Sequence, residues 1–470
     1  MSPIVGDTSV SGIANGGVSY WYASIGMPGY RDPLPGRCDA DVCIVGAGFT
    51  GLWTAYYLKR ERPDLRVVVL EKEFAGFGAS GRNGGWLSAE LASSRPAYAK
   101  THGREGVVDL LRAMRAAVDE VIAVAQRESI DANIRKDGLL HVARNPAQLA
   151  RLHESLEFER SWGAAESDFR YLTAAELDQR VVVHGALGGS FSPHCARVQP
   201  AKLVRGLARA VEGLGVPIYE QTTVLKIEPR AAHTDRGTVR APVVLRCLEG
   251  FTASVEGHKR EWLPMNSSMI VTEPLPPTAK AQIGWDRAEL LGDTAHGYMY
   301  AQRTVDDRIA LGGRGIPYRF GSRTDDRGAT QEWTIRALRE LLHDMFPAVR
   351  DVPLAQAWCG VLGVPRDWCA TVDLDPKTGL GTAGGYVGSG LTTTNLAGRT
   401  LVDLVLQRDT ELTRLPWVGR RVRPWELEPL RWLGVQAMYT FYRAADRREH
   451  ANGHARTSRI AHLANTITGR

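Results

Sequence analysis

A glycine-rich turn near the start of the chain has the residue types and spacing that hold the phosphates of a dinucleotide. Its glycines, Gly46, Gly48 and Gly51, follow a short apolar run at residues 41–45. Gly46 permits a tight turn, Gly48 lets the backbone approach a pyrophosphate, and Gly51 lets the following helix pack closely on a sheet. The phosphates would then face free N–H groups and the positive end of a helix dipole.

An acidic residue, Glu71, ends the next apolar run, twenty residues after Gly51. A carboxylate at this point can accept hydrogen bonds from the ribose hydroxyls of an adenosine. It would repel a 2′-phosphate, so the sequence disfavours NADP at this site. Because a predicted strand precedes the glycines and a helix-forming segment follows them, a plain glycine turn is the less favoured interpretation.

Two further loops rich in glycine and hydrogen-bond donors favour FAD as the dinucleotide. Residues 76–86 suit contact with the pyrophosphate, the ribityl chain and one face of a flavin. Residues 384–395 run into another helix, whose N-terminus would place positive charge where reduced flavin gathers negative charge. Besides the residues named above, we expect FAD to be bound by Lys72, Ser80, Arg82, Asn83 and Gly84.

The composition is typical of a globular protein of two or three domains. The 470 residues are 44% hydrophobic and 23% charged, which excludes a fibrous or mainly disordered chain. No apolar run approaches the ~18 residues of a membrane-spanning helix, and the N-terminus lacks a signal-peptide pattern. The six cysteines are scattered, without a Cys-x-x-Cys pair or a histidine cluster at metal spacing. We therefore expect a cytoplasmic protein with reduced thiols and no metal centre.

The net charge of +6 is concentrated at the C-terminal end. Residues 420–470 contain ten arginines and four acidic residues, so the rest of the chain is close to neutral. A basic tail can bind nucleic acid or an acidic membrane surface, but no nucleic-acid-binding signature accompanies it. We interpret it as an arginine-rich helical tail, solvated or packed on the body or on a neighbouring subunit, and expect no nucleic-acid partner.

Hydrophobic periodicity predicts the elements that must position these loops. Strands are expected at residues 41–45, 66–71, 216–227, 370–374 and 380–383, with a strand-rich segment at 240–320. Helices are expected at residues 52–60, 96–126, 146–162, 200–213, 331–345 and 392–406. Since the first and last glycine loops lie more than 300 residues apart, they predict one nucleotide domain interrupted by a long insertion.

The predicted fold class is α/β (α+β): a split Rossmann-like FAD-binding domain, an inserted antiparallel-sheet substrate domain and a helical C-terminal tail. The FAD-binding domain would comprise residues 38–90, 195–250 and 355–406. The substrate domain would comprise residues 91–194 and 251–354, and the basic tail residues 407–470. The substrate is then expected between the antiparallel sheet and one face of the flavin.

Residues 41–89, with their GAGFTG, VVVLEK and GASGRNGG runs, resemble the opening of the D-amino-acid-oxidase superfamily of FAD-dependent oxidoreductases. More narrowly, they are similar to the bacterial branch that contains gamma-glutamylputrescine and aminophosphonate oxidoreductases. The resemblance continues at residues 19–21, 199–204, 219–224 and 380–406, so it covers most of the chain. It implies adenine contacts at Val224 and flavin contacts in the last glycine loop at Gly385, Gly388, Gly390 and Leu391.

The resemblance implies an FAD-dependent amine oxidase or dehydrogenase. Members of the superfamily pass a hydride from the carbon of a C–N bond to flavin N5, and the resulting imine hydrolyses. The substrate would be a primary or secondary amine, an amino-acid derivative or an aminophosphonate. Tyr298, Tyr300 and Arg303 lie along a predicted strand that roofs the substrate cavity in this superfamily, and alternation puts 298 and 300 on one face. We expect these three side chains in the substrate cavity.

Three departures from the superfamily pattern leave parts of the chemistry open. Leu362 stands where amino-acid oxidases place the arginine that clamps a substrate carboxylate. An anionic group could instead be bound by Arg303, Arg314, Arg319 or Arg366. Cys359 falls where monomeric sarcosine oxidases attach flavin covalently, although non-covalent FAD is the favoured interpretation. Ala310 replaces their oxygen-activating lysine, so oxygen and another electron acceptor both remain open.

Two other classes of function remain as alternatives. A flavin monooxygenase that uses NAD(P)H would need a second nucleotide-binding loop and the glycine loop of flavin hydroxylases, neither of which we find in the sequence. A non-catalytic flavoprotein, whose basic tail recruits a partner, would have no need of a split flavin site. The sequence leaves the oligomeric state open.

Overall fold

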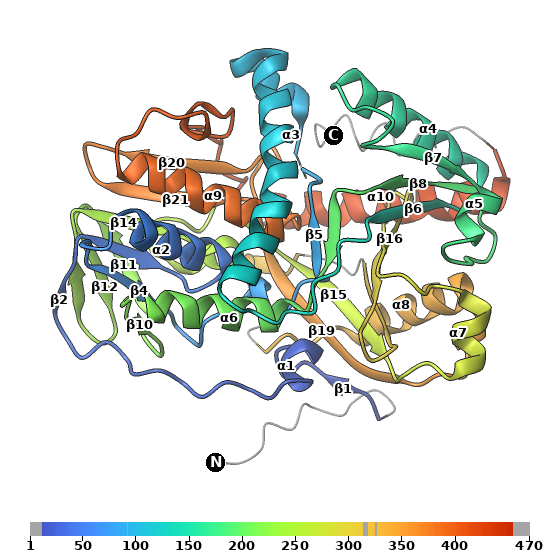
Figure 1. Cartoon of the computed structure of the whole chain (residues 1–470), viewed down its shortest axis with the longest axis horizontal. Helices are drawn as coiled ribbons and strands as arrows, with labels where there is room; N and C mark the ends of the chain where they lie inside the picture. Colours follow the sequence, from blue (N-terminus) through green and yellow to red (C-terminus); the bar gives the residue numbers. More distant parts are fainter. Residues whose placement is uncertain (1–11, 92, 314–317, 325–326, 455–470) are drawn as a thin grey trace.

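The computed structural model describes residues 12–91, 93–313, 318–324 and 327–454 (Figure 1). Two large sheets lie side by side, one built around the first glycine turn and one around the predicted substrate domain (Figure 1). The second sheet contains the long strands β15 (Leu263–Thr272) and β19 (Leu354–Val364), which cross the middle of the molecule. The space where the sheets meet is where a nucleotide and a substrate could share one cavity.

Within the described residues, six strands form the smaller sheet, which we call the nucleotide sheet. In order across the sheet they are β10 (Ile218–Tyr219), β4 (Val67–Leu70), β3 (Val42–Val45), β14 (Val243–Arg246), β21 (Leu380–Gly384) and β20 (Thr371–Asp375). All are parallel except β20, which returns antiparallel to β21. Every residue of β3 and β4 is buried, as expected of strands covered on both faces. Distant parts of the sequence thus share one sheet, which confirms the predicted split Rossmann-like fold.

Helices from distant segments pack together beside this sheet (Figure 1). They are α2 (Phe49–Glu61), α3 (Arg95–Arg127), α6 (Pro200–Gly213) and α9 (Gly390–Val405). The buried helix α2 contacts both α6 and α9, and Gly398 of α9 makes the close approach possible, since a Cβ there would lie 2.8 Å from the Cβ of Trp53. The helices predicted for α3, α6 and α9 are confirmed to within two residues at each end.

A four-stranded sheet corrects the single strand predicted at residues 216–227. Its strands are β11 (Val224–Glu228), β12 (Ala231–Thr234), β13 (Thr238–Arg240) and β2 (Cys38–Asp39). The predicted strand is in fact β10 and β11, which belong to different sheets. Between them the fully buried Glu220 pairs with Arg31 at 2.7 Å, and Gln221 has a φ of 50°. A buried ion pair and a left-handed residue break the strand at a place where the hydrophobic pattern alone continues.

Nine strands of the described chain form the large sheet, here called the substrate sheet. In order they are β1 (Ala14–Asn15), β19, β15, β18 (Ile309–Gly313), β17 (Tyr300–Arg303), β16 (Leu290–Asp293), β6 (Leu139–Ala143), β8 (Gly188–Ser192) and β7 (Arg170–Thr173). It is mostly antiparallel, as predicted, with parallel pairs at β1–β19 and β16–β6. The residues of β19 were expected in the FAD-binding domain, but β19 pairs with β15 along nearly its whole length. The other domain limits remain predictions.

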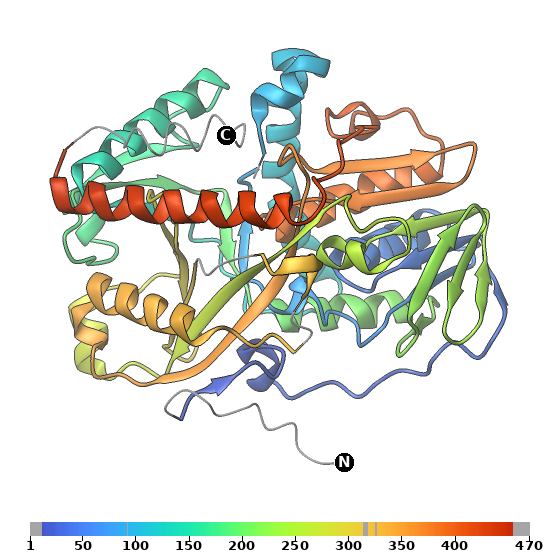
Figure 2. The same ribbon diagram turned by 180° about the vertical axis from the view of Figure 1, so that it is seen from behind.

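Four helices of the described chain pack on the substrate sheet: α4 (Pro146–Ser161), α5 (Ala174–Asp178), α7 (Pro277–Ile283) and α8 (Glu332–Met345). Other short elements include α1 (Tyr20–Ala23) and the two-stranded ladder of β5 (Trp86–Ser88) and β9 (Cys195–Arg197). The predicted tail forms α10 (Leu430–Asn452), a long helix that crosses the back of the molecule (Figure 2). Among the helices described, none has both the length and the hydropathy needed to cross a membrane.

Candidate active site

A cavity of about 690 Å³ extends from the nucleotide sheet to the substrate sheet. Its volume lies in the range of roughly 300–1,000 Å³ that small-molecule and cofactor sites occupy. Most of the predicted site residues line it: Gly46, Gly48, Glu71, Lys72, Ser80, Arg82, Asn83, Gly84, Val224, Tyr298, Tyr300, Gly388, Gly390 and Leu391. Three predicted site residues do not line the described part of the cavity: Gly51, Gly385 and Arg303.

The N-terminus of helix α2 opens into this cavity at the carboxyl end of β3. Gly46 has a φ of 106°, and a Cβ there would lie 2.6 Å from the carbonyl oxygen of Cys247. A Cβ on Gly51 would lie only 2.0 Å from the carbonyl oxygen of Gly46, so Gly51 supports the turn from beneath the cavity. The first turn of α2 carries no acidic residue. Its positive dipole end is therefore available to an anion in the cavity.

Glu71 lies directly after β4, beside this turn. Its Oε2 accepts a hydrogen bond from the Ala47 N–H (2.9 Å) and its Oε1 accepts one from the Glu73 N–H (3.0 Å). Desolvation raises the pKa of Glu71 to about 7. Lys72 and Val224, the first residue of β11, line the same end of the cavity. This end thus has the carboxylate and the apolar wall that an adenosine needs.

The loop at residues 76–86 is shaped by its own side chains. Ser80 Oγ accepts a hydrogen bond from the Phe49 N–H at the start of α2 (2.8 Å), and Asn83 Oδ1 accepts one from the Gly85 N–H (2.8 Å). The buried Arg82 donates from Nε to a backbone carbonyl of the same loop at 2.7 Å. These contacts fix the loop's conformation and leave its backbone along the cavity.

The last glycine loop reaches the cavity beside the first. Gly388, with a φ of 102°, lines the cavity just before the N-terminus of α9. The hydroxyl oxygens of Thr50 in α2 and Tyr386 in the loop are 3.0 Å apart, which links the two helix N-termini. Gly385 stands behind the cavity, where a Cβ would lie 2.4 Å from the ring of Pro365. Its role is to let the loop turn rather than to line the site.

Glu249 is a cavity residue that the sequence did not single out. Its Oε2 accepts a hydrogen bond from the Gly385 N–H (2.7 Å), and its Oε1 accepts bonds from the N–H groups of Tyr386 (3.2 Å) and Gly363 (3.3 Å). Desolvation raises its pKa to about 7. Glu249 follows the end of the buried parallel strand β14, the position where α/β sheets bind ligands, and this signal could have identified it.

The opposite wall of the cavity is formed by strands of the substrate sheet. Tyr300, the first residue of β17, lies with its hydroxyl 2.7 Å from Ser267 Oγ. Its ring packs over Gly84, where a Cβ would lie 2.7 Å from the ring. Burial raises the pKa of Tyr300 above its usual value. Tyr298 precedes the strand and also lines the cavity, so the structure brings the two predicted tyrosines together beside the residue-76–86 loop.

Arg303 does not lie in the cavity, which corrects its predicted placement. Along β17 the side chains alternate, so Gln302, which donates to the Gly84 carbonyl at 2.6 Å, faces the cavity side. The side chain of Arg303 pairs with Asp307 at 2.9 Å and donates to the Asp286 carbonyl at 2.9 Å. The prediction failed because successive side chains of a strand point to opposite faces, so positions 300 and 303, three residues apart, face opposite sides of the sheet.

The predicted anion-binding arginines do not form a clamp in the described structure. Arg366 pairs with Glu426 at 3.1 Å and lies over the ring of Trp425. Arg319 is not among the described lining residues, and Arg314 lies outside the described part of the chain. Leu362 does line the cavity, so the wall at the position of the superfamily's arginine is apolar.

Cys359 and Ala310 are both buried but are not among the described lining residues. The sulfur of Cys359 lies 3.4 Å from the carbonyl oxygen of Ala329 and 3.9 Å from Asn266 Oδ1. Ala310 packs in a cluster that contains Trp358. The geometry therefore gives no support to a covalent link at Cys359.

The far wall of the cavity carries three polar residues that the sequence did not single out. They are Glu90, which follows β5, His141 on β6 and Asp293 at the end of β16. Glu90 Oε1 lies 3.6 Å from His141 Nε2, and Asp293 Oδ1 accepts a hydrogen bond from the Met299 N–H at 3.0 Å. Because these three residues come from separate segments of the chain, no local sequence motif predicts that they lie together.

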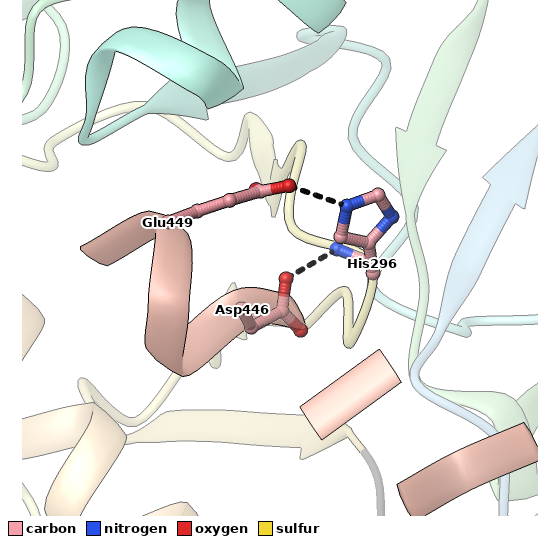
Figure 3. A group of neighbouring side chains, drawn as sticks. All are labelled: His296, Asp446 and Glu449. Carbon is pink, nitrogen blue, oxygen red and sulfur yellow. Dashed lines mark hydrogen bonds and ion pairs between the residues drawn. The ribbon is translucent and has the colours of Figure 1, made fainter. Parts of the chain in front are cut away.

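The C-terminal helix α10 binds the loop between β16 and β17 through side-chain hydrogen bonds (Figure 3). Asp446 of α10 accepts hydrogen bonds from the N–H groups of His296 (2.9 Å) and Gly297 (2.8 Å). Glu449, one turn further, contacts His296 Nε2 at 3.0 Å and pairs with Arg151 at 2.7 Å. The three side chains bring ligand atoms within 4.8 Å of one another, yet each contacts protein groups, including the cation Arg151. We read them as the attachment of α10 to the loop that carries Tyr298.

The residues present fit a bound FAD. Two helix N-termini, those of α2 and α9, open into one cavity and could face its phosphates and its flavin. Glu71 is in position for ribose hydroxyls, and Gly84 lines the cavity where the Tyr300 ring packs on it. Chain segments that are hundreds of residues apart therefore converge on a single cavity.

Comparison with known proteins defines the class of the chain. Residues 41–404 match the family described as DAO, FAD dependent oxidoreductase. The chain belongs to this family, and it is an enzyme whose cofactor is FAD. The resemblance of residues 41–89 to the D-amino-acid-oxidase superfamily is thereby confirmed.

Individual relatives sharpen the comparison. The chain is 31% identical over 407 residues to gamma-glutamylputrescine oxidoreductase of Escherichia coli (strain K12), covering 84% of this chain and 89% of that protein. It is 24% identical over 391 residues to glycine oxidase of Geobacillus kaustophilus, covering 80% of this chain and 96% of that protein. The crystal structure of glycine oxidase from Geobacillus kaustophilus superposes with a TM-score of 0.69 at 22% identity, covering 82% of this chain and 99% of that chain. L-proline dehydrogenase from P. horikoshii gives a TM-score of 0.66 at 17% identity, covering 82% of this chain and 98% of that chain. These two structures share the fold.

Proposed function

We propose that this enzyme oxidises the C–N bond of a primary or secondary amine, which includes amino-acid derivatives and aminophosphonates. Bound FAD would supply flavin N5 as the acceptor of a hydride from the carbon next to nitrogen, and water would hydrolyse the resulting imine. The observation that carries the proposal is the continuity of one cavity, with Glu71 and two helix N-termini at one end and the Tyr300–Ser267 pair at the other. The names of the relatives, a gamma-glutamylputrescine oxidoreductase and a glycine oxidase, support an amine substrate.

The places of these residues in the cavity support the following roles in cofactor binding. The turn at Gly46 and Gly48 would hold the pyrophosphate, Glu71 the ribose, and the backbone at Val224 the adenine. Ser80, Arg82 and Asn83 would keep their loop along the flavin. Gly51 and Gly385 would act through packing, and the remaining contacts would come from Lys72, Gly84, Gly388, Gly390 and Leu391.

The substrate side of the cavity would orient the amine rather than carry out acid–base chemistry. Tyr300 and Tyr298 wall the cavity beside Gly84, and Leu362 adds an apolar surface. A neutral amine needs mainly correct positioning of its C–H bond, which such a wall provides. Because Leu362 cannot pair with a carboxylate, simple α-amino acids should be poor substrates.

Anaerobic mixing of the holoprotein with a panel of amines tests the proposal. We expect bleaching of the yellow flavin absorbance by amines and no bleaching by NAD(P)H. Bleaching by NAD(P)H alone would instead favour the flavin monooxygenase, and no bleaching by either would favour a non-catalytic flavoprotein. Readmitting oxygen to the bleached enzyme then distinguishes an oxidase, which recovers its colour quickly, from a dehydrogenase that needs another acceptor.

A further inference from the structure

The outer side of helix α10 carries a row of apolar side chains, which we call the outer stripe. Leu430 is 67% exposed, Leu433 52% and Phe441 39%. Ala437 and Ala444, which are also exposed, complete the row. Spacings of three and four residues put all five on one side of the helix. In Figure 2 the helix, drawn in red, lies across the near side of the molecule, and no other described helix or strand is drawn in front of it.

The opposite side of α10 is already used within the chain. Val435, Tyr442 and Ala445 are buried there, and Asp446 accepts the hydrogen bonds from the loop between β16 and β17. The helix also lies beyond residue 404, where the match to the family ends. The packing of the described residues therefore does not account for the outer stripe. A continuous exposed apolar surface usually marks an interaction site.

The outer stripe is complementary to itself when two copies run antiparallel. With Ala437 opposite its own copy, Leu433 shares a layer with Phe441, since both are four residues from Ala437. Leu430 then shares a layer with Ala444, since both are seven residues away, so a large side chain meets a small one. Alanine at the centre lets the two helix axes approach to about 8 Å, the lower end of the usual range. A two-fold axis repeats each layer, as a homodimer contact requires.

The charges at the end of α10 favour the same direction. Arg447 and Arg448, both exposed, follow the outer stripe. In a parallel pair each arginine would face its own copy. In the antiparallel pair the two copies of Arg448 are separated by 22 residues of helical rise, twice the 11 residues from Ala437. That distance is about 33 Å, several times the screening length of about 8–10 Å.

The size of the central side chains favours a helix over a lipid surface as the partner. Helices that lie in a membrane surface present large side chains such as Trp, Phe and Leu. The middle of the outer stripe instead has Ala437, with Gly434 beside it, where a Cβ would meet nothing within 4 Å. Small residues of this kind suit the close approach of a second helix.

We propose that the outer stripe is a homodimer interface, in which two copies of α10 pack antiparallel about a two-fold axis at Ala437. Burial of Leu430, Leu433 and Phe441 from both copies drives the association. The exposed Phe320, which stands edge-on to Trp432 of α10, widens the apolar contact. Because the inner side of α10 holds the loop that carries Tyr298, the dimer supports the helix on which the substrate end depends.

Light scattering and sedimentation of the holoprotein over a dilution series test the interface. We expect a dimer whose Kd rises roughly hundredfold or more in Leu433→Asp, because a symmetric pair buries the new charge twice. The control is Leu225→Asp on β11, which changes a leucine of equal exposure, 53%. It should remain as dimeric as the wild type.

A cysteine at the axis tests the register. Five of the six native cysteines are buried and Cys38 is partly exposed, so the unmodified protein gives a low background of crosslinking. Under mild oxidation Ala437→Cys should form a disulfide-linked dimer on a non-reducing gel, since a disulfide needs Cα atoms about 4.4–6.8 Å apart. Glu157→Cys, on an exposed position of α4, is the control and should not crosslink above the background.

A protein that is monomeric at every concentration would overturn the proposal. A dimer in which either variant behaves like its control would overturn it as well, because the interface would lie elsewhere or pair in another register. A monomer that sediments with phosphatidylglycerol vesicles would assign the outer stripe to a membrane surface instead. A dimer that forms only after deletion of residues 455–470 would assign it to the chain's own C-terminal residues. Amine oxidation is measured separately, by bleaching, and stands or falls without the dimer.

Discussion

The two ends of the cavity are built in different ways. The nucleotide end, beside the nucleotide sheet, is shaped by the backbone of short consecutive segments, as in the turn from Gly46 to Gly51. At the substrate end, single side chains from separate segments converge, as with Tyr300 on β17, His141 on β6 and Glu90 after β5. A backbone site is specified by where glycine is required, whereas a side-chain site is specified by strand register. The cofactor end should therefore tolerate few changes of glycine, and the substrate end should change its specificity through single side chains.

The largest effect should come from Gly48→Val at the nucleotide end. Gly48 lines the cavity at the start of α2, so a valine side chain there would occupy space inside the cavity. Its Cβ alone would lie 3.0 Å from Ser80 Oγ, which accepts a hydrogen bond from the Phe49 N–H. We expect FAD retention to fall roughly tenfold or more, since the phosphates lose the helix N-terminus. The measurement is FAD released by boiling, per chain, after gel filtration.

Gly213→Val serves as the control for this change, because a Cβ at Gly213 meets nothing within 4 Å. It should keep its FAD. A yellow, stoichiometric Gly48→Val protein would show that the first glycine turn does not bind the cofactor.

The second effect concerns Glu249, the cavity residue that accepts hydrogen bonds from the last glycine loop. Its pKa is raised to about 7 in the folded protein against 4.5 for an unperturbed glutamate, because burial disfavours the charged form. The protonated form is thus favoured by folding, so this contribution to stability is full below pH 4.5 and is lost as the pH rises through about 7. We expect the stability difference between wild type and Glu249→Gln, measured by urea unfolding, to shrink across this window.

Glu157→Gln, which changes an exposed carboxylate, should show no such pH dependence. A Glu249→Gln protein whose difference from wild type is constant from pH 4.5 to 7 would mean that Glu249 is ionised throughout. The carboxylate would then hold the N–H groups of Gly385 and Tyr386 as an anion, and reduced flavin beside it would be disfavoured by its charge.

The residues predicted for the nucleotide end lie together in the cavity for a physical reason. Its parts are contiguous, so the types and spacing of Gly46, Gly48 and Glu71 already determine the local geometry. Glu249 escaped notice because its hydrogen bonds reach residues more than 100 positions away, although its place after β14 was a usable signal. Sequence spacing describes backbone turns better than it describes long-range side-chain contacts.

The substrate end was predicted only in part. Tyr298 and Tyr300 lie in the cavity as expected, but Arg303 does not, because its position on β17 faces away. Which side of a strand faces the cavity depends on pairing with distant strands. His141 illustrates this dependence: Gly292 pairs with both His141 and Tyr300, and these pairings put the two residues in register across the substrate sheet.

A third, smaller effect should follow from Tyr300→Phe. The change removes the hydroxyl that lies 2.7 Å from Ser267 Oγ but keeps the ring against Gly84. We expect unchanged FAD content and a fall in kcat/KM for amines of roughly tenfold, typical of one buried hydrogen bond. In a double-mutant cycle with Ser267→Ala, the second change should add little to the first. Additive losses would mean that Tyr300 and Ser267 act separately.

The smallest effect should come from Asp446→Asn in α10, which tests whether the substrate end depends on the tail. Asparagine can accept through one oxygen where aspartate uses both, so one of the bonds to the His296 and Gly297 N–H groups is lost. The loop that carries Tyr298 is then held less firmly. We expect KM for amines to rise by a few-fold, the size of one net hydrogen bond, with unchanged FAD content.

Arg448→Gln, an exposed change on the same helix, is the control and should leave KM as in wild type. Loss of FAD from Asp446→Asn would mean that the tail supports the whole cavity and that the two ends are not independent. A rise in KM with full FAD content would show the opposite. The nucleotide end would then be complete without the tail, and the substrate end would owe part of its shape to a helix more than 140 residues further along the chain.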